Sequence, residues 1–373
     1  MKIVILVHNL TGGGAERVAA LWASGFAERG DEVYVINQSN IEDGRYDISD
    51  KVRILTIGST IKNRYILGLL RKIGFERNKY LHQLKTIIHS LCPDVCIGVM
   101  GSYARDVYDV TRDMNTIIIQ TYHSSFDLPE YAPEIRKRDI QKCFINDINI
   151  KVKTVLTQAD KIFIGNRMDN VFVLPNPLSF RPLEEVPKDK SKVVLACGRL
   201  DVWDVKGFDL LIKAWSIVGK KHLDWRLQIA GTGRRESQKY LTSLANECQI
   251  TEQIDFIGYR KDIVDYYRKS EIFVLSSRFE GFGMVLIEAM SQGCACIACD
   301  YKGRQKEIII DDSQGILCPT DNLQVLIDSI ERMINDSSYR KQCQKNAIVR
   351  SSYYLIDNIM RKWDEILTKA VAN

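Results

Sequence analysis

The sequence predicts an α/β protein with two Rossmann-like domains. Short apolar, β-branched runs alternate with longer segments of helical period, and the alternation occurs twice along the 373 residues. This pattern is typical of βαβ units that build a parallel sheet. The length also favours two domains, or at most three, because single hydrophobic cores rarely grow beyond about 250 to 300 residues.

The first half of the chain is expected to form one sheet with its connecting helices. Its strands are predicted at Lys2–Val7, Glu32–Ile36, Asp94–Gly98, Thr116–Thr121, Lys161–Gly165 and Val171–Leu174. Apolar residues at helical spacing predict helices at Ala15–Arg29, Glu76–Leu91 and Ala104–Asp113.

The second half repeats the arrangement. Its strands are predicted at Lys192–Ala196, Trp225–Ala230, Gln253–Ile257, Glu271–Leu275 and Cys294–Ala298. Its helices are predicted at Phe208–Val218, Arg235–Glu247, Val285–Gln292, Asn322–Ile334 and Ser338–Arg350. A last helix over 352–370 has one apolar face and is expected to pack back on the first domain.

The domain boundary is expected at a cluster of prolines between Pro175 and Pro187, which runs into the charged stretch Glu184–Lys192. Prolines at this density cannot continue a helix or a central strand, so the segment is a predicted linker. The expected domains are therefore 1–176 and 190–350.

Composition excludes several classes of protein. Hydrophobic residues make up 45% and charged residues 27%, which are ordinary values for a folded globular chain. A net charge of +5 is too weak to indicate nucleic acid as a partner. No stretch reaches 18 consecutive apolar residues, so no transmembrane span is predicted.

Cysteine usage indicates a reducing compartment. The chain has ten cysteines, but its start lacks the pattern of a secretory signal peptide, so reduced cysteines and a cytoplasmic location are expected. The run from Cys294 to Cys299 contains a C-x-x-C. Without a second such pair or nearby histidines, a buried strand explains it better than a structural zinc site.

The first candidate site is the loop Thr11-Gly12-Gly13-Gly14, between the first strand and the first helix. Glycines allow close backbone approach, and a helix N-terminus offers free amides, so a phosphate or sugar cradle is one interpretation. A plain strand-to-helix turn is the other. A dinucleotide site is weakly supported, because the spacing is not G-x-G-x-x-G.

The densest motif runs from Ser276 to Gly293 and carries Glu280 and Glu288. Gly281 and Gly283 precede a predicted helix whose N-terminus suits a diphosphate. Eight helical residues would span about 12 Å, so one carboxylate could hold a ribose diol and the other a sugar. The alternative is one capping glutamate and one solvated glutamate.

Two cations lie near another predicted strand end. Arg199 follows the strand Lys192–Ala196, and Lys206 precedes a helix start. Cations at a helix N-terminus are unfavourable unless an anion lies between them, so a bound diphosphate is one explanation. Ordinary surface cations are the other.

Together these segments resemble the family 4 retaining glycosyltransferases of GT-B fold. The resemblance is carried by Gly198-Arg199 with Lys206-Gly207, and by Glu280 and Glu288 within Glu-Gly-Phe-Gly-x-x-x-x-Glu-Ala-Met. It covers nearly the whole chain. In that family a cleft between two domains holds a nucleotide sugar, so 1–176 is expected to bind the acceptor and 190–350 the donor.

The resemblance implies roles for individual residues. Arg199 and Lys206 are expected to bind the diphosphate, and Glu288 the ribose hydroxyls. Glu280 and the backbone amides after it are expected to hold the donor sugar. His123 is expected to face the same sugar. The implied catalytic residues are His123, Glu280, Arg199 and Lys206. The implied donor-binding residues are Gly13, Gly14, Arg199, Lys206, Tyr259, Glu280, Gly281, Phe282, Gly283, Met284, Val285, Leu286 and Glu288.

The function that follows is transfer of a sugar from a nucleotide-diphosphate donor, expected to be a UDP-sugar, to a glycan or lipid-linked hydroxyl. Retention at the anomeric carbon, a role in surface polysaccharide or lipopolysaccharide synthesis, and the lack of a cofactor or metal are implied by the resemblance. A nucleotide-sugar epimerase and a noncatalytic nucleotide-sugar binder remain as alternatives. Nucleotide release that depends on an acceptor separates transfer from both.

The segment 61–79 is rich in Lys and Arg, with apolar residues at helical spacing among them. A basic amphipathic helix suits an anionic membrane surface, which would place the enzyme on the cytoplasmic face of the membrane. An ordinary solvated helix that packs on the first sheet is the alternative.

Overall fold

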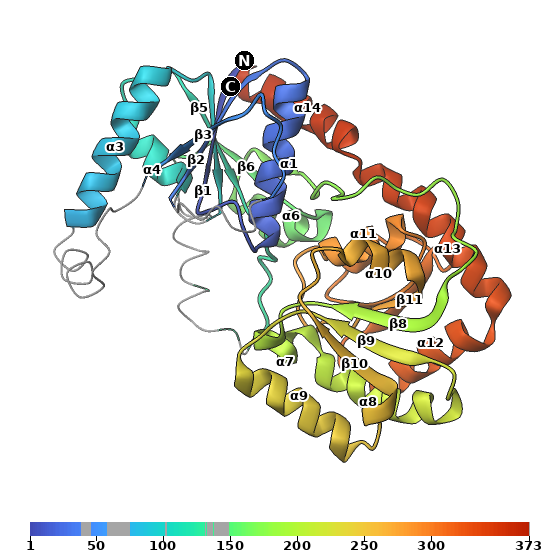
Figure 1. The fold of residues 1–373 in the computed structure, drawn as a ribbon. Helices are drawn as coiled ribbons and strands as arrows, with labels where there is room; N and C mark the ends of the chain where they lie inside the picture. Colours follow the sequence, from blue (N-terminus) through green and yellow to red (C-terminus); the bar gives the residue numbers. More distant parts are fainter. Residues whose placement is uncertain are drawn as a thin grey trace. The chain divides into compact units, whose positions relative to one another are not determined.

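The structure is a computed structural model that describes residues 1–38, 46–57, 75–100, 103–130, 132, 137 and 149–372. The chain forms two compact units, one of Met1–Pro177 with Ile356–Asn373 and the other of Leu178–Leu355. Each unit contains one parallel sheet with helices on its faces (Figure 1). The predicted α/β class with two Rossmann-like folds is confirmed.

The first unit is built on a seven-stranded parallel sheet of order β3-β2-β1-β4-β5-β6-β7. Its strands are β1 Lys2–Val7, β2 Glu32–Asn37, β3 Arg53–Thr56, β4 Val95–Val99, β5 Ile117–Thr121, β6 Val152–Val155 and β7 Val171–Val173. Its helices are α1 Gly14–Glu28, α3 Phe75–Leu91, α4 Tyr103–Val110, α6 Gln158–Ile164 and α14 Ile356–Ala372.

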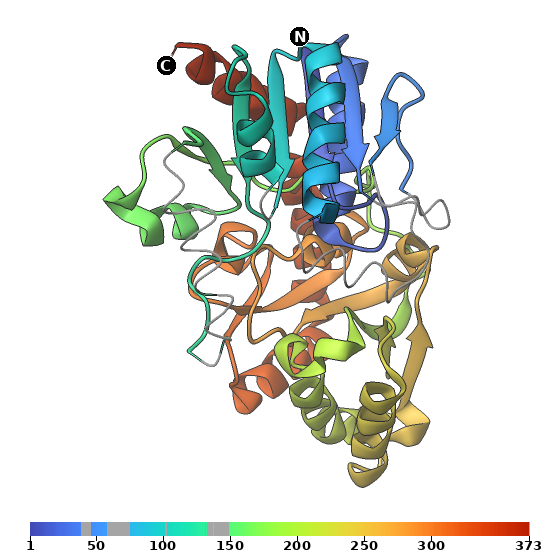
Figure 2. The ribbon, with the colours of Figure 1, turned by 90° about the vertical axis from the view of Figure 1, so that its left-hand side faces the viewer.

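Helices cover both faces of this sheet. Helices α3 and α4 lie on one face and α1 and α14 on the other, and the turned view has α3 in front of the sheet and α14 behind it (Figures 1 and 2). On the first face, Val4 of β1 packs in a cluster with Leu84 of α3 and Val107 of α4. On the second, Trp22 of α1 meets Trp363 of α14 edge to face, with ring centroids 5.0 Å apart.

One predicted strand of this unit is wrong. The run Lys161–Gly165 was expected to be a strand, but its residues lie in helix α6 and the turn that follows. Thr157 caps this helix by accepting a hydrogen bond from the Asp160 amide, a local signal that outweighs the apolar run. Ile162 is 70% exposed, so the run is not the buried stretch that a central strand requires.

Sequence periodicity also missed several short elements. Strands β3 and β13 lie at sheet edges, where half-exposed residues weaken the apolar pattern. Strand β6 has only four residues, although all four are buried. Helix α10, Ile263–Lys269, has seven residues and is too short for a clear helical period.

The second unit is built on a six-stranded parallel sheet of order β10-β9-β8-β11-β12-β13. Its strands are β8 Ser191–Cys197, β9 Arg226–Ala230, β10 Ile254–Gly258, β11 Ser270–Leu275, β12 Ala295–Asp300 and β13 Gly315–Pro319. Its helices are α7 Trp203–Lys206, α8 Phe208–Val218, α9 Arg235–Glu247, α10, α11 Met284–Ser291, α12 Leu323–Asn335 and α13 Ser337–Ser351.

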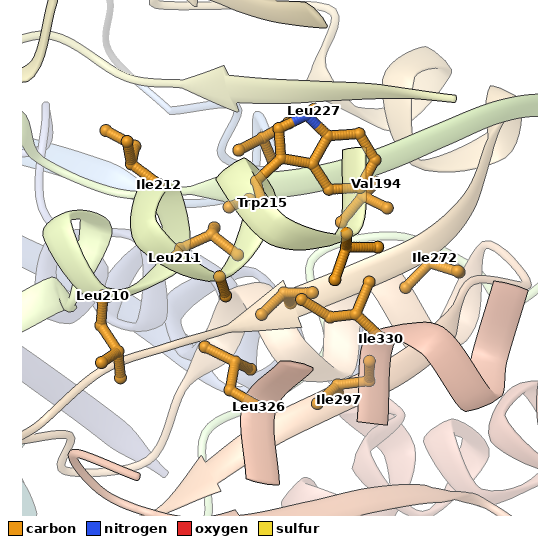
Figure 3. Packing of buried hydrophobic residues seen from close by; sticks show 14 of the residues in the cluster. Val194, Leu210, Leu211, Ile212, Trp215, Leu227, Ile272, Ile297, Leu326 and Ile330 are labelled. Atoms are coloured by element: carbon orange, nitrogen blue, oxygen red, sulfur yellow. The ribbon is translucent and has the colours of Figure 1, made fainter. Parts of the chain in front are cut away.

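The core of this unit lies between helices α8, α9 and α12 and one face of the sheet. Figure 3 shows Trp215 and Leu211 of α8 in the same cluster as Ile330 of α12. Each fully buried apolar side chain of this kind contributes about 1.5 to 3 kcal/mol to the stability of the folded state. The packed layer therefore holds the strand ends in fixed positions. Cys296 and Cys299 are buried in β12, which confirms the expected buried strand.

Within the described ranges, no helix combines the length and the apolarity needed to cross a membrane. Most of the basic segment 61–79 falls in residues 58–74, which lie outside the described residues. Helix α3 begins at Phe75 and corresponds to the helix predicted over Glu76–Leu91.

Candidate active site

The strand order of the second unit reverses between β8 and β11, which is where open α/β sheets generally bind ligands. Strands β9 and β10 extend the sheet on one side of β8, whereas β11 to β13 extend it on the other. The loops after β8 and β11 therefore diverge, and open α/β sheets bind ligands in such crevices at the carboxyl ends of their strands. Arg199 follows β8, and the motif with Glu280 follows β11.

Lys206 and Glu280 form an ion pair near this reversal of strand order. The Lys206 Nζ lies 2.6 Å from Glu280 Oε2, and the two side chains are 22% and 15% exposed. The Ser277 hydroxyl donates to the same carboxylate oxygen at 3.2 Å. The structure thus brings together two predicted site residues that follow different strands, Lys206 at the end of α7 and Glu280 in the loop after β11.

A glycine allows the loops that carry this pair to approach. Gly207 has φ +64°, and a Cβ there would lie only 2.0 Å from the Ser276 carbonyl oxygen. The Ser276 hydroxyl in turn donates to the Lys206 carbonyl at 2.9 Å. No other residue type fits this turn without separating the loops, so Gly207 is required for the position of Lys206.

Arg278 ties the same loops together, and sequence reasoning missed it. Its guanidinium donates two hydrogen bonds to the Asp209 carboxylate, at 2.7 and 2.9 Å, while its amide donates to the Val205 carbonyl. The hydrogen bond to Asp209 raises the pKa of Arg278 further above its usual range. Arg278 is part of the sequence motif, but its partner Asp209 is 69 positions away and is identified only by the fold.

The loop after Glu280 leads into helix α11 as predicted. Gly283, with φ +95°, is the N-cap, and the helix begins at Met284. The Phe282 carbonyl accepts a hydrogen bond from Gln305 Nε2 at 3.2 Å, which fixes the loop from behind. Because first-turn amides lack intrahelical acceptors, the start of α11 is suited to an anion.

Glu288 lies in α11, and only 2% of its surface is exposed. Its Oε1 accepts from the Ser179 hydroxyl at 2.6 Å, and its Oε2 accepts from the Tyr267 hydroxyl at 3.3 Å. The alternative of a solvated glutamate is therefore wrong. Sequence reasoning missed both donors, because they lie 109 and 21 positions from Glu288 and belong to no motif.

Two predicted residues are not drawn into these contacts. Arg199 is exposed, and it forms no ion pair with any residue in the described ranges. Tyr259 follows the edge strand β10 and is 62% exposed. Strand β9 separates β10 from β8, so Tyr259 stands farther along the sheet edge than the loop that carries Arg199.

The first unit has its own reversal of strand order between β1 and β4, and the loop of Gly13 and Gly14 follows β1. Gly13 is the N-cap of α1, and a Cβ on it would lie 1.9 Å from Glu16 Oε2. The Glu16 carboxylate thus already lies against the helix start. An anion would meet a like charge there, so the loop suits sugar hydroxyls better than phosphate.

His123 lies just beyond β5 and is partly buried. Its Nε2 is 3.0 Å from Thr121 Oγ1, its Nδ1 is 3.2 Å from Asn176 Oδ1, and its ring packs 5.2 Å from that of Trp22. Burial lowers the pKa of His123 to about 4. The imidazole is therefore neutral at neutral pH and acts as a hydrogen-bonding group without charge.

The loop that follows His123 is anchored by Asp160, which sequence reasoning also missed. The carboxylate is fully buried and accepts hydrogen bonds from the Phe126 amide at 2.9 Å, the Ser125 hydroxyl at 3.2 Å and the Thr157 hydroxyl at 2.7 Å. Helix α6 therefore provides both a capped helix start and an anchor for the loop beyond β5.

No cluster of three or more His, Cys, Asp or Glu side chains that could hold a metal ion is found in the part of the chain that the structure describes. The expectation of a reaction without a resident metal stays a prediction.

Comparison with known proteins identifies relatives of this chain. Residues 182–350 match the family described as glycosyl transferases group 1. An uncharacterized glycosyltransferase of Haemophilus influenzae is 27% identical over 98% of this chain and 99% of its own length. An alpha-1,4-N-acetyl-D-galactosaminyltransferase of Campylobacter jejuni is 26% identical over 99% of both chains. The chain is a glycosyltransferase.

The solved structures place this glycosyltransferase in the GT-B fold. Sucrose-phosphate synthase from Thermosynechococcus elongatus superposes with a TM-score of 0.80 at 17% identity, over 100% of both chains. The TarM protein of S. aureus gives 0.77 at 15% identity, over 98% of this chain and 99% of its own. The matched family segment of the glycosyltransferase contains Arg199, Lys206, Glu280 and Glu288, whereas His123 and the Gly13 loop lie outside it.

Proposed function

We propose that this glycosyltransferase transfers a sugar from a UDP-sugar to a hydroxyl of a glycan or lipid-linked acceptor, with retention at the anomeric carbon. One observation carries the donor site. The Lys206–Glu280 pair, the start of α11 and the buried Glu288 all follow or flank β8 and β11, where the strand order reverses. This edge therefore offers a cation, helix amides and two carboxylates to one elongated ligand.

The ion pair leaves both partners able to bind a donor. A lysine ammonium has three N–H donors, so Lys206 can hold Glu280 with one and a phosphate oxygen with another. The contacts of Glu280 with Lys206 and Ser277 both use Oε2. Its Oε1 is then the oxygen that accepts hydroxyls of the donor sugar.

The leaving diphosphate gains negative charge as the bond to the sugar breaks. Lys206, the exposed Arg199 and the amides at the start of α11 would stabilise that charge without a metal. We expect Arg199→Ala and Lys206→Ala each to lower turnover by about 100-fold, as does removal of one preorganised charge-stabilising group elsewhere. If a chelator abolishes turnover and magnesium or manganese restores it, the proposal that no metal is needed is refuted.

His123 contributes a neutral ring on the acceptor unit. Both of its nitrogens already have partners, Thr121 and Asn176, so a sugar hydroxyl would share or replace one of these contacts. Because the ring is uncharged at neutral pH, it brings no cation against an anomeric centre that becomes positive. Retention, with the leaving phosphate taking the proton of the acceptor, rests on the family resemblance.

The nature of the donor and acceptor draws on relatives. TarM was solved with UDP, and Anabaena HepE with UDP and glucose. The Campylobacter jejuni relative is named for a diphospho-undecaprenol-linked glycan, and a relative from Erwinia amylovora is named for amylovoran biosynthesis. We therefore propose a role in surface polysaccharide or lipid-linked glycan synthesis.

The experiment that tests the donor site is a thermal-shift screen of nucleotide sugars, followed by calorimetry on the best ligand. A ligand that binds only the folded state raises the melting temperature by mass action. Glu288→Gln keeps the side-chain shape but removes the charge, and it should weaken donor binding by about 1 to 3 kcal/mol. Unchanged affinity would remove Glu288 from the site.

The alternatives make different demands on the acceptor. A nucleotide-sugar epimerase would release nucleotide without an acceptor, and a noncatalytic binder would release none. None of the relatives reported above is named as an epimerase. Nucleotide release that appears only when acceptor is added supports transfer.

Membrane contact through 61–79 is part of the same proposal, and its residues 61–74 lie outside the described structure. Each Lys or Arg near an anionic surface contributes about 1 kcal/mol, so three or four suffice for reversible attachment. Cosedimentation with anionic liposomes should weaken with salt and in a variant with Arg64, Arg71 and Lys72 changed to Glu. Equal sedimentation of both proteins with anionic and neutral liposomes, or none with either, would refute the contact.

A further inference from the structure

Arg278 contacts the chain on both sides of Lys206. Its guanidinium donates to the Asp204 carbonyl at 2.5 Å, and its amide donates to the Val205 carbonyl at 2.8 Å. Beyond Lys206, the Asp209 carboxylate accepts two hydrogen bonds from the same guanidinium, at 2.7 and 2.9 Å. The segment that carries Lys206 is therefore held by one residue of the motif after β11.

The charge of Arg278 is offset by two carboxylates. The guanidinium pairs with Asp209, and its Nε also donates to Asp321, which lies between β13 and α12. Asp321 is exposed, whereas the side chains of Arg278 and Asp209 are mostly buried, so water screens the pair with Asp209 less. An arginine with two acidic partners is a poor phosphate ligand, although it lies inside the motif.

The position of the Lys206 ammonium depends on how the two loops are joined. Lys206 has a long, flexible side chain, and its partner Glu280 lies two residues after Arg278 in the other loop. The hydrogen bond from the Ser276 hydroxyl to the Lys206 carbonyl joins the loops at one point. The guanidinium joins them at a second, because a planar fork fixes the direction of a carboxylate as well as its distance.

We propose that Arg278 is a positioning residue that places Lys206 against the diphosphate of the donor, through its contacts with the chain on both sides of that lysine. The inference rests on the proposed function, because it takes Lys206 as a ligand of the diphosphate. It goes further by giving a role in donor binding to an arginine that itself binds no phosphate.

The test is a double-mutant cycle in which calorimetry measures the binding of UDP to the full chain. The cycle compares the wild type, Arg278→Lys, Lys206→Ala and the variant with both changes. Arg278→Lys keeps the positive charge but loses the fork of donors. A residue that acts through Lys206 has no further effect once Lys206 is removed, whereas a residue that binds phosphate itself adds its own loss.

Arg226→Lys is the matched control. Arg226 donates two hydrogen bonds to the Asp255 carboxylate, at 2.5 and 2.9 Å, and one to the Glu252 carbonyl at 2.7 Å. It lies at the start of β9, at the opposite edge of the sheet from the strand ends of the proposed donor site. Thermal melting shows whether each variant is folded. If Arg278→Lys is not, Asp209→Asn replaces it, because this change removes the charge of the carboxylate that Arg278 holds.

Lys206→Ala should weaken UDP binding by about 10-fold or more, the value of one hydrogen bond between charged groups. Arg278→Lys should weaken it by about 3-fold or more, and the double variant should bind UDP within about 2-fold of Lys206→Ala. Arg226→Lys should stay within about 2-fold of the wild type. With a UDP-sugar as substrate, Arg278→Lys should also lower kcat at temperatures where it is fully folded, because a misplaced Lys206 stabilises the leaving diphosphate less.

The other outcomes overturn the inference in different ways. If Lys206→Ala weakens UDP binding but Arg278→Lys does not, the positioning role is refuted while the proposed donor site stands. If the two losses add in the double variant, Arg278 acts independently of Lys206, and the inference is refuted. It is also refuted if Arg226→Lys weakens UDP binding as much as Arg278→Lys does, because the loss then reflects the stability of the unit. If Lys206→Ala binds UDP like the wild type, or the wild type does not bind UDP, the inference falls together with the proposed role of Lys206.

Discussion

Replacement of Asp160 by asparagine should destabilise the first unit strongly, although the two side chains have nearly the same shape. The carboxylate is fully buried and accepts from the Phe126 amide and from the Ser125 and Thr157 hydroxyls. An amide can keep the two contacts made by Oδ1, but its NH2 group would face the Thr157 hydroxyl that now donates. One hydrogen bond is thus reversed and two lose the assistance of charge.

The size of the effect follows from these contacts. Hydrogen bonds to charged groups contribute about 1.5 to 3 kcal/mol each, compared with about 1 kcal/mol for neutral pairs. Two bonds of reduced strength and one mismatched donor together predict a loss of about 2 to 4 kcal/mol in the free energy of unfolding. The loop that follows His123 should loosen first, because the Phe126 amide and the Ser125 hydroxyl belong to it.

Native-state hydrogen exchange with mass spectrometry can follow this loss, since it separates peptides of the first unit from those of the second. Peptides that contain Phe126 should exchange faster in Asp160→Asn, while those of the second unit should not change. Asp169→Asn, at an exposed position after α6, is the matched control. A stability within about 0.5 kcal/mol of wild type, the usual range for surface substitutions, would refute the anchoring role.

Three further predictions concern other residues of the fold and the site. The pKa of His123 in the folded state is about 4, below its unfolded value, so the stability that the neutral ring contributes is complete above about pH 6.5 and is lost as the pH falls toward 4. Urea unfolding should show this loss of about 2 kcal/mol in the wild type but not in His123→Gln. Gly207→Ala places a Cβ 2.0 Å from the Ser276 oxygen, so chemical denaturation should show about 2 kcal/mol or more of destabilisation, with lower turnover; wild-type values would contradict the close loop contact. Trp363→Ala removes the contact with Trp22, and hydrogen exchange should show a loss of about 3 to 5 kcal/mol in the stability of the first unit. A loss below about 1 kcal/mol would argue against tight packing of α14.

Patterns that are local in the chain could be predicted from the sequence. Short apolar runs that alternate with helical segments identify most strands and helices of both sheets, because a strand buried on both faces must be apolar throughout. The start of α11 at Met284 follows from the glycines before it, since Gly283 adopts a positive φ. Glu280 and Glu288 of the proposed donor site could be named for the same reason, because their spacing on one loop and one helix is itself a local property.

Local patterns were less reliable where two of them competed. Lys161–Gly165 has the composition of a strand. However, Thr157 accepts a hydrogen bond from the Asp160 amide and so caps helix α6, which includes most of this run. The short edge strands β3 and β13 left little apolar signal, because one side of an edge strand faces solvent.

Only the tertiary structure decided which side chains meet and which charges they keep. Lys206 and Glu280 are 74 positions apart, and their ion pair depends on loops that two different strands bring to one sheet edge. Ser179 reaches Glu288 across 109 positions, and Asn176 reaches His123 across 53. Burial, which arises from the packing of the whole unit, makes Glu288 depend on its donors and keeps His123 neutral, and no spacing along the chain contains that information.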